Sequence, residues 1–253
     1  MASASHPERG NIVTTLVVIP TYDEAENIER VVTGLLRVQP DVDVLVVDDD
    51  SPDGTGDIVA TLRATDQRIH LMRRKQKQGL GVAYRAGFGW GLDRGYERLV
   101  EMDADGSHRA EDLQALLDAS TAGADLVLGS RWVPGGGVVD WPWYRRLISR
   151  GGTWYARLML GLDIRDLTGG FRVFRAETLR RLRLGDVASQ GYCFQIDMAR
   201  RTAAAGMSIV EVPITFVERT HGRSKMSGAI VGEALWKVTM WGLARWSPRR
   251  SRT

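Results

Sequence analysis

Short apolar segments alternate with helical patterns along the first half of the chain. Residues 14–19, 42–47 and 99–102 are apolar runs of the kind that forms buried strands, and the first two are rich in β-branched side chains. Between these two, residues 28–36 repeat apolar side chains with the period of a helix. This alternation predicts an α/β fold with a mostly parallel central sheet flanked by helices, continuing to about residue 130.

Acidic residues follow directly after these three runs. The clusters are 23–24, 48–50 and the pair Asp103 and Asp105. Ligands of α/β sheets bind beyond the carboxyl ends of the strands, and alternate residues of an extended segment point the same way. Asp103 and Asp105 can therefore share one hard cation, Mg²⁺ or Mn²⁺, which keeps positions open for water and phosphates. A lone Asp-x-Asp is more often a solvated turn, but the other two clusters favour a metal site.

Basic side chains are concentrated in the second half of the chain. A cation bound by acids on one side and arginines on the other suits a diphosphate substrate, because the metal bridges the phosphates and the arginines neutralise the remaining charge. The loop 219–225 contains Arg219, His221, Arg223 and Lys225 around a glycine, and we expect it to close over phosphates. The other candidate cations are Arg131, Arg145, Arg146, Arg150 and Arg172.

The overall charge is only mildly basic. A net charge of +3 suits a small anionic substrate or an acidic lipid surface and does not point to nucleic acid. The one cysteine, Cys193, excludes an internal disulfide and fits a reducing compartment. Residues 1–11 are polar and lack the apolar core of a signal peptide. We therefore expect a cytoplasmic protein, peripheral on the cytoplasmic face of a membrane.

The C-terminal segment is predicted to be an amphipathic helix. Residues 229–246 are largely apolar but include Glu233, Lys237 and Arg245, so we expect them to lie on a bilayer rather than to cross it. We assign residues 12–227 to a single catalytic domain and 228–253 to this membrane-contacting helix and a basic tail. The side chains expected to face the lipid include Leu235, Val238, Trp241 and Leu243.

Glycines are unusually frequent between residues 79 and 95. A dinucleotide-binding loop needs Gly-x-Gly-x-x-Gly directly after a strand. Tyr84 stands where the third glycine would follow Gly79 and Gly81, so the pattern excludes a Rossmann oxidoreductase. We predict instead a helix whose glycines let it pack closely against the sheet.

Several motifs, taken in order, resemble the inverting GT-A-fold glycosyltransferases of family 2. This likeness rests on residues 20–27, 46–49, 51–55 and 102–105. A closer resemblance, to dolichol-phosphate mannose synthases and their bacterial polyprenol-phosphate counterparts, extends over residues 14–227. The motifs that carry it are residues 129–131, 148–151, 166–172 and 211–219.

The resemblance implies a GT-A fold and a metal-dependent, inverting transfer of mannose from GDP-mannose to a polyprenyl (dolichyl-type) monophosphate. It implies that Asp103, Asp105 and Ser107 hold Mg²⁺ or Mn²⁺, and that Asp103, Asp105 and Arg131 are catalytic. Further implied partners are a membrane surface and a membrane-anchoring protein. The implied donor-binding residues are Pro20, Tyr22, Glu24, Val47, Asp49, Asp103, Ala104, Asp105, Arg131, Arg219 and Lys225. The residues placed at the acceptor phosphate are Arg145 and Ser149.

Two alternatives remain open at this point. A polyprenyl-phosphate glycosyltransferase of the same fold could use another donor, such as UDP-glucose. The chain could also be a non-catalytic partner that binds a nucleotide sugar or a lipid. The presence of both Asp-x-Asp acids together with Arg219 and Lys225 favours an enzyme.

Overall fold

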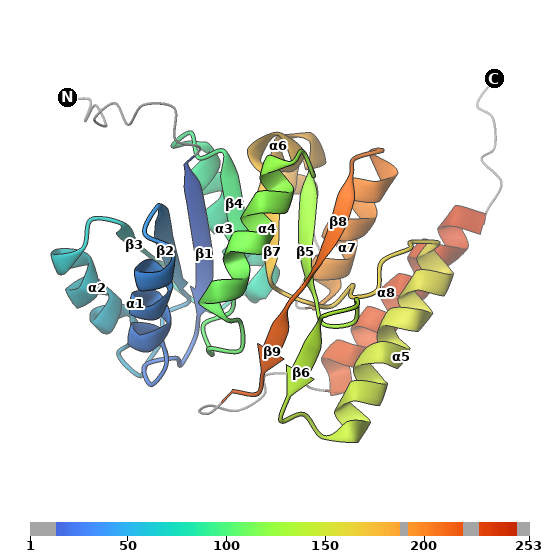
Figure 1. Ribbon diagram of the computed structural model, residues 1–253, viewed down its shortest axis with the longest axis horizontal. Helices are drawn as coiled ribbons and strands as arrows, with labels where there is room; N and C mark the ends of the chain where they lie inside the picture. Colours follow the sequence, from blue (N-terminus) through green and yellow to red (C-terminus); the bar gives the residue numbers. More distant parts are fainter. Residues whose placement is uncertain (1–13, 188–191, 220–227, 247–253) are drawn as a thin grey trace.

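The computed structural model describes residues 14–187, 192–219 and 228–246. Its first half alternates strands and helices as predicted (Figure 1). These elements are β1 (Thr15–Thr21), α1 (Ile28–Val38), β2 (Val42–Asp48), α2 (Thr55–Thr65), β3 (Ile69–Arg73), α3 (Leu80–Leu92), β4 (Arg98–Glu101), the short helix η1 (Ala110–Asp112), α4 (Leu113–Thr121) and β5 (Leu126–Ser130).

The second half adds helices at one end of the molecule and completes the sheet. Its elements are β6 (Gly137–Val139), α5 (Trp143–Leu160), β7 (Arg172–Arg175), α6 (Ala176–Leu182), the short helix η2 (Leu184–Asp186), α7 (Tyr192–Ala204), β8 (Ile209–Pro213), β9 (Thr215–Val217) and α8 (Gly228–Trp246).

A seven-stranded sheet runs through the middle of the molecule in the order β3-β2-β1-β4-β7-β5-β8. The first four strands pair in parallel, and β5 pairs in parallel with β8. Strand β7 lies antiparallel between β4 and β5. The predicted fold class, a mostly parallel sheet flanked by helices, is confirmed. Strands β6 and β9 form a separate small sheet below the main one in Figure 1.

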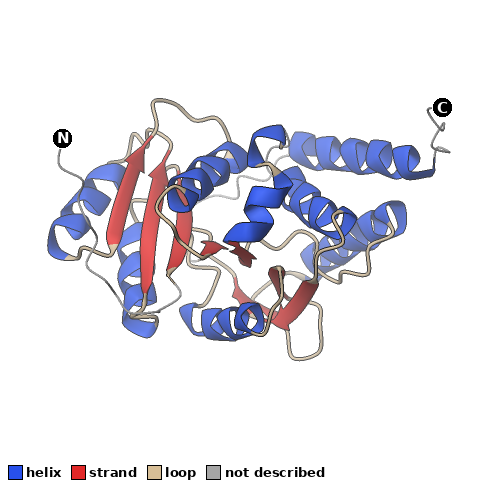
Figure 2. Ribbon diagram, turned by 90° about the horizontal axis from the view of Figure 1, so that it is seen from above, coloured by secondary structure: helices blue, strands red, loops and turns tan. Residues whose placement is uncertain are grey.

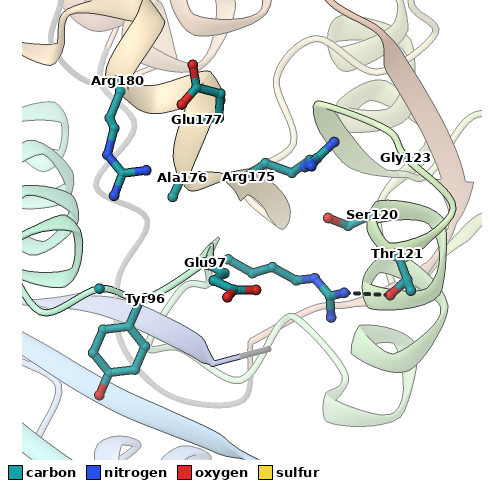
Figure 3. A pocket seen from close by; sticks show the side chains of 11 residues that line it. Tyr96, Glu97, Ser120, Thr121, Gly123, Arg175, Ala176, Glu177 and Arg180 are labelled. Atoms are coloured by element: carbon teal, nitrogen blue, oxygen red, sulfur yellow. Dashed lines mark hydrogen bonds between the residues drawn. The ribbon is translucent and has the colours of Figure 1, made fainter. Parts of the chain in front are cut away.

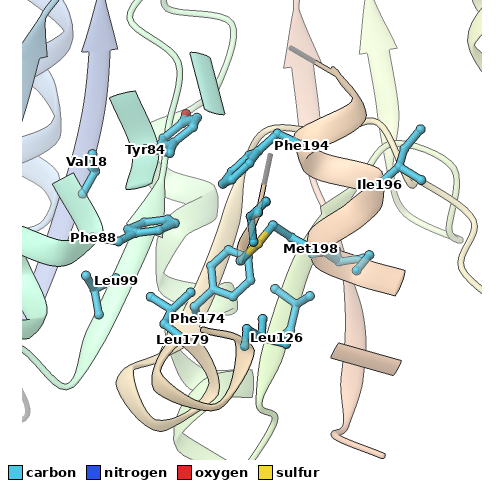
Figure 4. Packing of buried hydrophobic residues seen from close by; sticks show 14 of the residues in the cluster. Val18, Tyr84, Phe88, Leu99, Leu126, Phe174, Leu179, Phe194, Ile196 and Met198 are labelled. Atoms are coloured by element: carbon cyan, nitrogen blue, oxygen red, sulfur yellow. The ribbon is translucent and has the colours of Figure 1, made fainter. Parts of the chain in front are cut away.

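Helices cover both faces of the sheet. Helices α1, α2 and α4 lie on one face and α3, α6 and α7 on the other (Figures 1 and 2). Because side chains alternate along a strand, Val17 of β1 packs with the first set of helices and Val18 with the second. Figure 4 shows the second cluster, in which the rings of Phe88 and Phe174 meet edge to face, 5.6 Å between centroids. Both faces of the sheet are therefore covered by helices and shielded from water, as is typical of a largely parallel sheet.

Helix α3 approaches the sheet so closely that two of its positions have no room for a side chain. A Cβ at Gly87 would lie 2.4 Å from Cγ1 of Val18, and one at Gly91 would lie 2.8 Å from Cδ2 of Leu16. The prediction that glycines allow close packing here is confirmed.

Helices α5 and α8 lie side by side at the end of the molecule beyond β8 (Figure 1). Helix α5 was not predicted from the sequence. Of the helices in the described ranges, none combines the length and apolar character of a membrane span.

Helix α8 has nearly its predicted bounds, but its predicted lipid face is wrong in part. Val238 is buried and Trp241 packs against the hydrophobic core, whereas Leu235 and Leu243 are exposed. These four side chains do not share one face, because the helix uses Val238 and Trp241 to attach to the rest of the protein.

Candidate active site

The turns after β1, β2 and β4 meet at the carboxyl edge of the sheet, because these strands are parallel neighbours. Glu24 lies in the turn after β1, and its backbone N–H donates to Oγ1 of Thr55 (3.0 Å). Its carboxylate is close enough to Asp103, after β4, to influence that carboxyl electrostatically. The structure thus brings the acidic turn residues to one edge.

The loop that carries Asp103 and Asp105 is held in place from two sides. The backbone N–H of Asp103 donates to Nδ1 of His108 (3.2 Å), and the buried His108 ring stacks on Phe171 with 4.9 Å between centroids. A Cβ at Gly170 would lie 3.3 Å from Oδ2 of Asp103, so a glycine there leaves room for the carboxylate. His108 and Gly170 therefore support the loop.

The electrostatics of this loop favour an added cation. Partial removal from water raises the pKa of the Asp103 carboxyl, and the nearby Asp105 carboxylate raises it further, against the opposing effects of His108 and Arg219. Arg219 places Nη1 3.4 Å from Oδ2 of Asp105. A divalent cation would relieve the repulsion between the two carboxylates.

The residues present fit a magnesium or manganese ion. Within the described residues there is no group of three or more His, Cys, Asp and Glu side chains that could hold a metal. Asp103 and Asp105 alone would leave most positions to water and substrate phosphates, which is how these ions bind in phosphate-transfer sites. The hydroxyl of Ser107 is buried and has no hydrogen-bond partner in the described part of the chain. Its role as a third ligand stays a prediction.

On the β2 side, Asp49 is bound by residues that sequence reasoning missed. Nη1 of Arg74 donates to Oδ1 of Asp49 (2.8 Å), and the backbone N–H of Gln78 donates to Oδ2 (3.3 Å). Burial raises the pKa of Asp49 although Arg74 acts to lower it. Lys77 places Nζ 3.7 Å from the ring centroid of Tyr22. The basic run at residues 73–75, which begins at the last residue of β3, was the available signal.

The other residues predicted to bind the donor differ in how far their side chains are exposed to solvent. Pro20 is partly exposed near the end of β1, and Ala104 is buried between the two acids. The side chain of Val47 is fully buried in the hydrophobic core and its backbone lies between β1 and β3, so its contact with a donor stays a prediction. Lys225 lies outside the described residues.

Arg131, predicted to touch the donor, is bound to a buried carboxylate. Its Nε and Nη2 donate to the two oxygens of Asp166, each at 2.7 Å. Burial would raise the pKa of Asp166, but the Arg131 guanidinium holds it below its ordinary value. Nη2 also donates to Thr168 (3.0 Å). Arg131 thereby fixes the loop that leads to Gly170, and its direct contact with a donor stays a prediction.

The two predicted acceptor residues both lie on α5. Arg145 forms an ion pair with Glu218, and its guanidinium carbon lies 4.2 Å from the ring centroid of Trp141. Ser149 follows one turn later and is partly exposed. Their contact with a phosphate stays a prediction.

A cavity of about 570 Å³ lies away from these residues, at the amino end of β4 (Figure 3). Arg98 is one of its lining residues and donates to Oγ1 of Thr121 (2.7 Å). Among the described residues, none that is predicted for the donor, the metal or the acceptor lines this cavity. The candidate site is therefore the carboxyl edge and not this cavity.

A buried arginine and a buried glutamate lie directly behind the Asp103 loop. Arg172 is fully buried and donates to the carbonyl oxygens of Gly169 (2.8 Å), Gln195 (2.6 Å) and Leu167 (2.8 Å). Its Nε lies 3.9 Å from Oε2 of Glu101, also fully buried. Burial raises the pKa of Glu101 from 4.5 to about 8, with Arg172 opposing the rise.

Glu101→Gln is expected to remove a loss of stability that the wild type undergoes as the pH rises from 4.5 to about 8. Since the pKa of Glu101 is about 8 in the folded chain and 4.5 ordinarily, the folded state holds a proton that the unfolded state has lost. This contribution is complete below the lower value and is lost as the pH rises through the upper one. Thermal unfolding in the presence of a chelator should show the stability of the variant rising relative to that of the wild type between pH 4.5 and about pH 8. Parallel curves for the two proteins would contradict this assignment.

The pattern of Glycosyl transferase family 2 matches residues 16–183. An undecaprenyl-phosphate mannosyltransferase of Micrococcus luteus is 57% identical over 238 residues, covering 94% of this chain and 98% of the relative. A polyprenol monophosphomannose synthase of Mycolicibacterium smegmatis is 54% identical over 230 residues, covering 90% and 87%.

Solved structures of low sequence identity share the fold. Glucosyl-3-phosphoglycerate synthase from Mycobacterium tuberculosis, in complex with Mn²⁺, UDP and glucosyl-3-phosphoglycerate, has a TM-score of 0.63 at 20% identity, covering 92% of this chain and 79% of that one. A mannosyltransferase from Pyrobaculum calidifontis, in complex with GDP-Man and Mn²⁺, has a TM-score of 0.56 at 18% identity, covering 91% and 73%. The expected GT-A fold is confirmed.

Proposed function

The chain belongs to glycosyl transferase family 2, and on this basis we propose that it transfers mannose from GDP-mannose to a polyprenyl monophosphate. The products are polyprenyl β-D-mannosyl phosphate and GDP. The two relatives named for mannose and polyprenyl phosphate support the substrate classes. The observation that carries the proposal is the meeting of Asp103, Asp105 and Arg219 at the carboxyl edge of the sheet.

The acceptor itself supplies the nucleophile in this reaction. A phosphate monoester has a second pKa of about 6 and is mostly dianionic at neutral pH. One of its oxygens attacks C1 of mannose from the side opposite the diphosphate, the bond from C1 to the diphosphate oxygen breaks, and GDP leaves with the electron pair. No general base is needed, since the attacking oxygen carries no proton. Attack from the opposite side inverts the anomeric carbon.

The protein residues align the substrates and stabilise the charge that develops on GDP. Asp103 and Asp105, with Ser107 as the third candidate, would hold Mg²⁺ or Mn²⁺. When bound, the ion neutralises charge on the leaving diphosphate. Arg219, next to Asp105, adds positive charge on the same side. In this proposal Asp49, which accepts from Arg74, and Tyr22, which Lys77 covers, would contact the nucleoside.

A transfer assay with GDP-mannose, a polyprenyl phosphate and Mg²⁺ or Mn²⁺ tests the proposal. We expect mannosyl lipid to form, to disappear with a chelator, and to carry the β linkage by NMR. A competing reaction with UDP-glucose discriminates between donors, and preferential glucose transfer would replace the mannose assignment. Donor binding without turnover would instead favour a non-catalytic binding protein.

We further propose that α5 is the principal membrane-contacting element. One face of this helix carries apolar side chains spaced by about one or two helical turns, each more than half exposed. Arg146 and Arg150, both exposed, border this face, as expected for a helix lying on anionic lipid. We call this face the apolar stripe of α5, and it consists of Trp143, Leu147, Trp154 and Leu158.

A protein that anchors the chain to a membrane stays a prediction, and so does a location on the cytoplasmic face of that membrane.

The double variant Trp143→Ser, Leu147→Ser is expected to reduce binding to phosphatidylglycerol–phosphatidylcholine vesicles by about a hundredfold or more, because each side chain contributes about 1.5–3 kcal/mol when buried in lipid. Sedimentation measures the bound fraction. Val210→Ser, an exposed apolar position on β8, serves as the control and should bind as the wild type does. Equal binding by the double variant would reject α5 as the contact. Removing α8 is a poorer test, because its Val238 is part of the core.

A further inference from the structure

Glu218 stands between two arginines that flank the candidate site. It follows β9, and its backbone N–H donates to the carbonyl of Val139 in β6 (3.3 Å), which fixes where its side chain can reach. One carboxylate oxygen, Oε2, pairs with Nη1 of Arg145 on α5. The other, Oε1, lies 4.0 Å from Nε of Arg219.

These contacts complete a row of alternating charges across the site. The row runs from Asp105 to Arg219, then to Glu218 and Arg145. It joins the Asp103–Asp105 loop to the helix that carries the apolar stripe. The phosphate of an acceptor that approaches from the lipid along α5 would therefore reach Arg145 while Arg145 is still paired with Glu218.

We propose that Glu218 is a specificity-determining residue that occupies Arg145 until the phosphate dianion of the acceptor displaces it. This inference rests on the proposed function. A phosphate monoester carries nearly two negative charges at neutral pH and a carboxylate carries one, so the dianion wins the exchange. The displaced Glu218 still has Arg219 beside it, so the exchange does not strand an unpaired carboxylate.

Competition between Glu218 and lipid phosphates for Arg145 would reduce the binding of ordinary phospholipid headgroups at a membrane surface. Bilayer phospholipids are mostly phosphodiesters, which carry a single negative charge and greatly outnumber a polyprenyl phosphate. Without Glu218, Arg145 would bind these headgroups. With Glu218, a monoanion gains little by replacing a carboxylate of equal charge that is already in place.

Glu218→Gln tests this selectivity. In mixed micelles, we expect the variant to bind polyprenyl phosphate with a KM about five- to tenfold lower than the wild type, the worth of a partly buried charged contact. Phosphatidylglycerol, a monoanionic diester, should inhibit the variant at about five- to tenfold lower concentration than the wild type. A purely structural role would lower kcat and raise KM.

Asp140→Asn is the matched control. It removes one negative charge close to Trp141 and α5, and Asp140 makes no ion pair in the described part of the chain. Its φ of 60° suits asparagine, so the substitution should not strain the backbone. We expect acceptor KM and phosphatidylglycerol inhibition as in the wild type. An equal effect in this control would show that only overall charge matters and would overturn the proposal.

Two further measurements keep the test decisive. In an Arg145→Gln background, Glu218→Gln should no longer change the KM for the acceptor, and a persisting effect would contradict the mechanism. The wild-type enzyme should be inhibited far more strongly by phosphatidic acid, a monoester, than by phosphatidylglycerol. Equal inhibition by the two lipids would also contradict the proposed role of Glu218. Absence of any mannose transfer by the wild type would instead reject the proposed function.

Discussion

Asp105→Asn is expected to lower mannose transfer about a thousandfold, the scale of losing one main source of charge stabilisation at a reacting group. Asparagine is nearly isosteric and its Oδ1 can still accept the N–H of Ser107, which Asp105 accepts at 3.0 Å. The loop should therefore keep its shape. What is lost is the negative charge that would bind the metal and that now pairs with Arg219. Initial rates with saturating GDP-mannose and Mn²⁺ measure the effect.

The control for this variant is Asp23→Asn. Asp23 is an exposed acid in the turn after β1, its φ is 55°, and asparagine tolerates that conformation. It makes the same change of charge at the same edge of the sheet. We expect rates within about twofold of the wild type, as for surface substitutions without a special contact. Comparable losses in the two variants would mean that Asp105 acts only through the general acidity of this edge.

Arg172→Met is expected to destabilise the fold by about 3–5 kcal/mol, the usual cost of breaking a buried charged contact. Three buried backbone carbonyls lose their donor at once, those of Leu167, Gly169 and Gln195. Below about pH 8 Glu101 is largely protonated and carries no charge that Arg172 must balance. The main loss of stability therefore comes from the three carbonyls that lose their donor. For a chain of this size the fall in Tm should be about 10 °C or more.

Arg175→Met makes the same substitution on the same strand, at an exposed position. Arg175 lies directly opposite Arg98 in the β4–β7 ladder, so its removal relieves a like-charge contact. Its free energy of unfolding should stay within about 0.5 kcal/mol of the wild type or rise slightly. If Arg172→Met unfolds at the same temperature as Arg175→Met, the contacts of Arg172 do not hold the turn before β7.

The sequence predicted the sheet well because its strands are short apolar runs and its helices have a regular apolar period. It did not predict α5, whose apolar side chains point two ways. Ala156 and Leu160 face inwards, while Trp143 and Leu147 face outwards, so no single stripe marks the helix. The antiparallel insertion of β7 between β4 and β5 depends on pairing between distant segments, which no local pattern encodes.

For the candidate site, the acids could be predicted because parallel strands end at a common edge. The partners of the arginines could not. Arg131 pairs with Asp166 and Arg145 with Glu218, across 35 and 73 residues of chain, and only the folded arrangement brings them together. Arg74 and Lys77 were missed because the basic residues after β3 resemble a solvated loop until Asp49 and Tyr22 lie beside them.

The central claim is that the Asp103–Asp105 loop holds the diphosphate of GDP-mannose together with a divalent ion. A crystal structure with GDP-mannose and Mn²⁺, measured with anomalous scattering, tests it most directly. We predict an anomalous peak within bonding distance of both carboxylates, with the diphosphate oxygens completing its coordination. A nucleotide bound elsewhere, with no peak at this loop, would contradict the account.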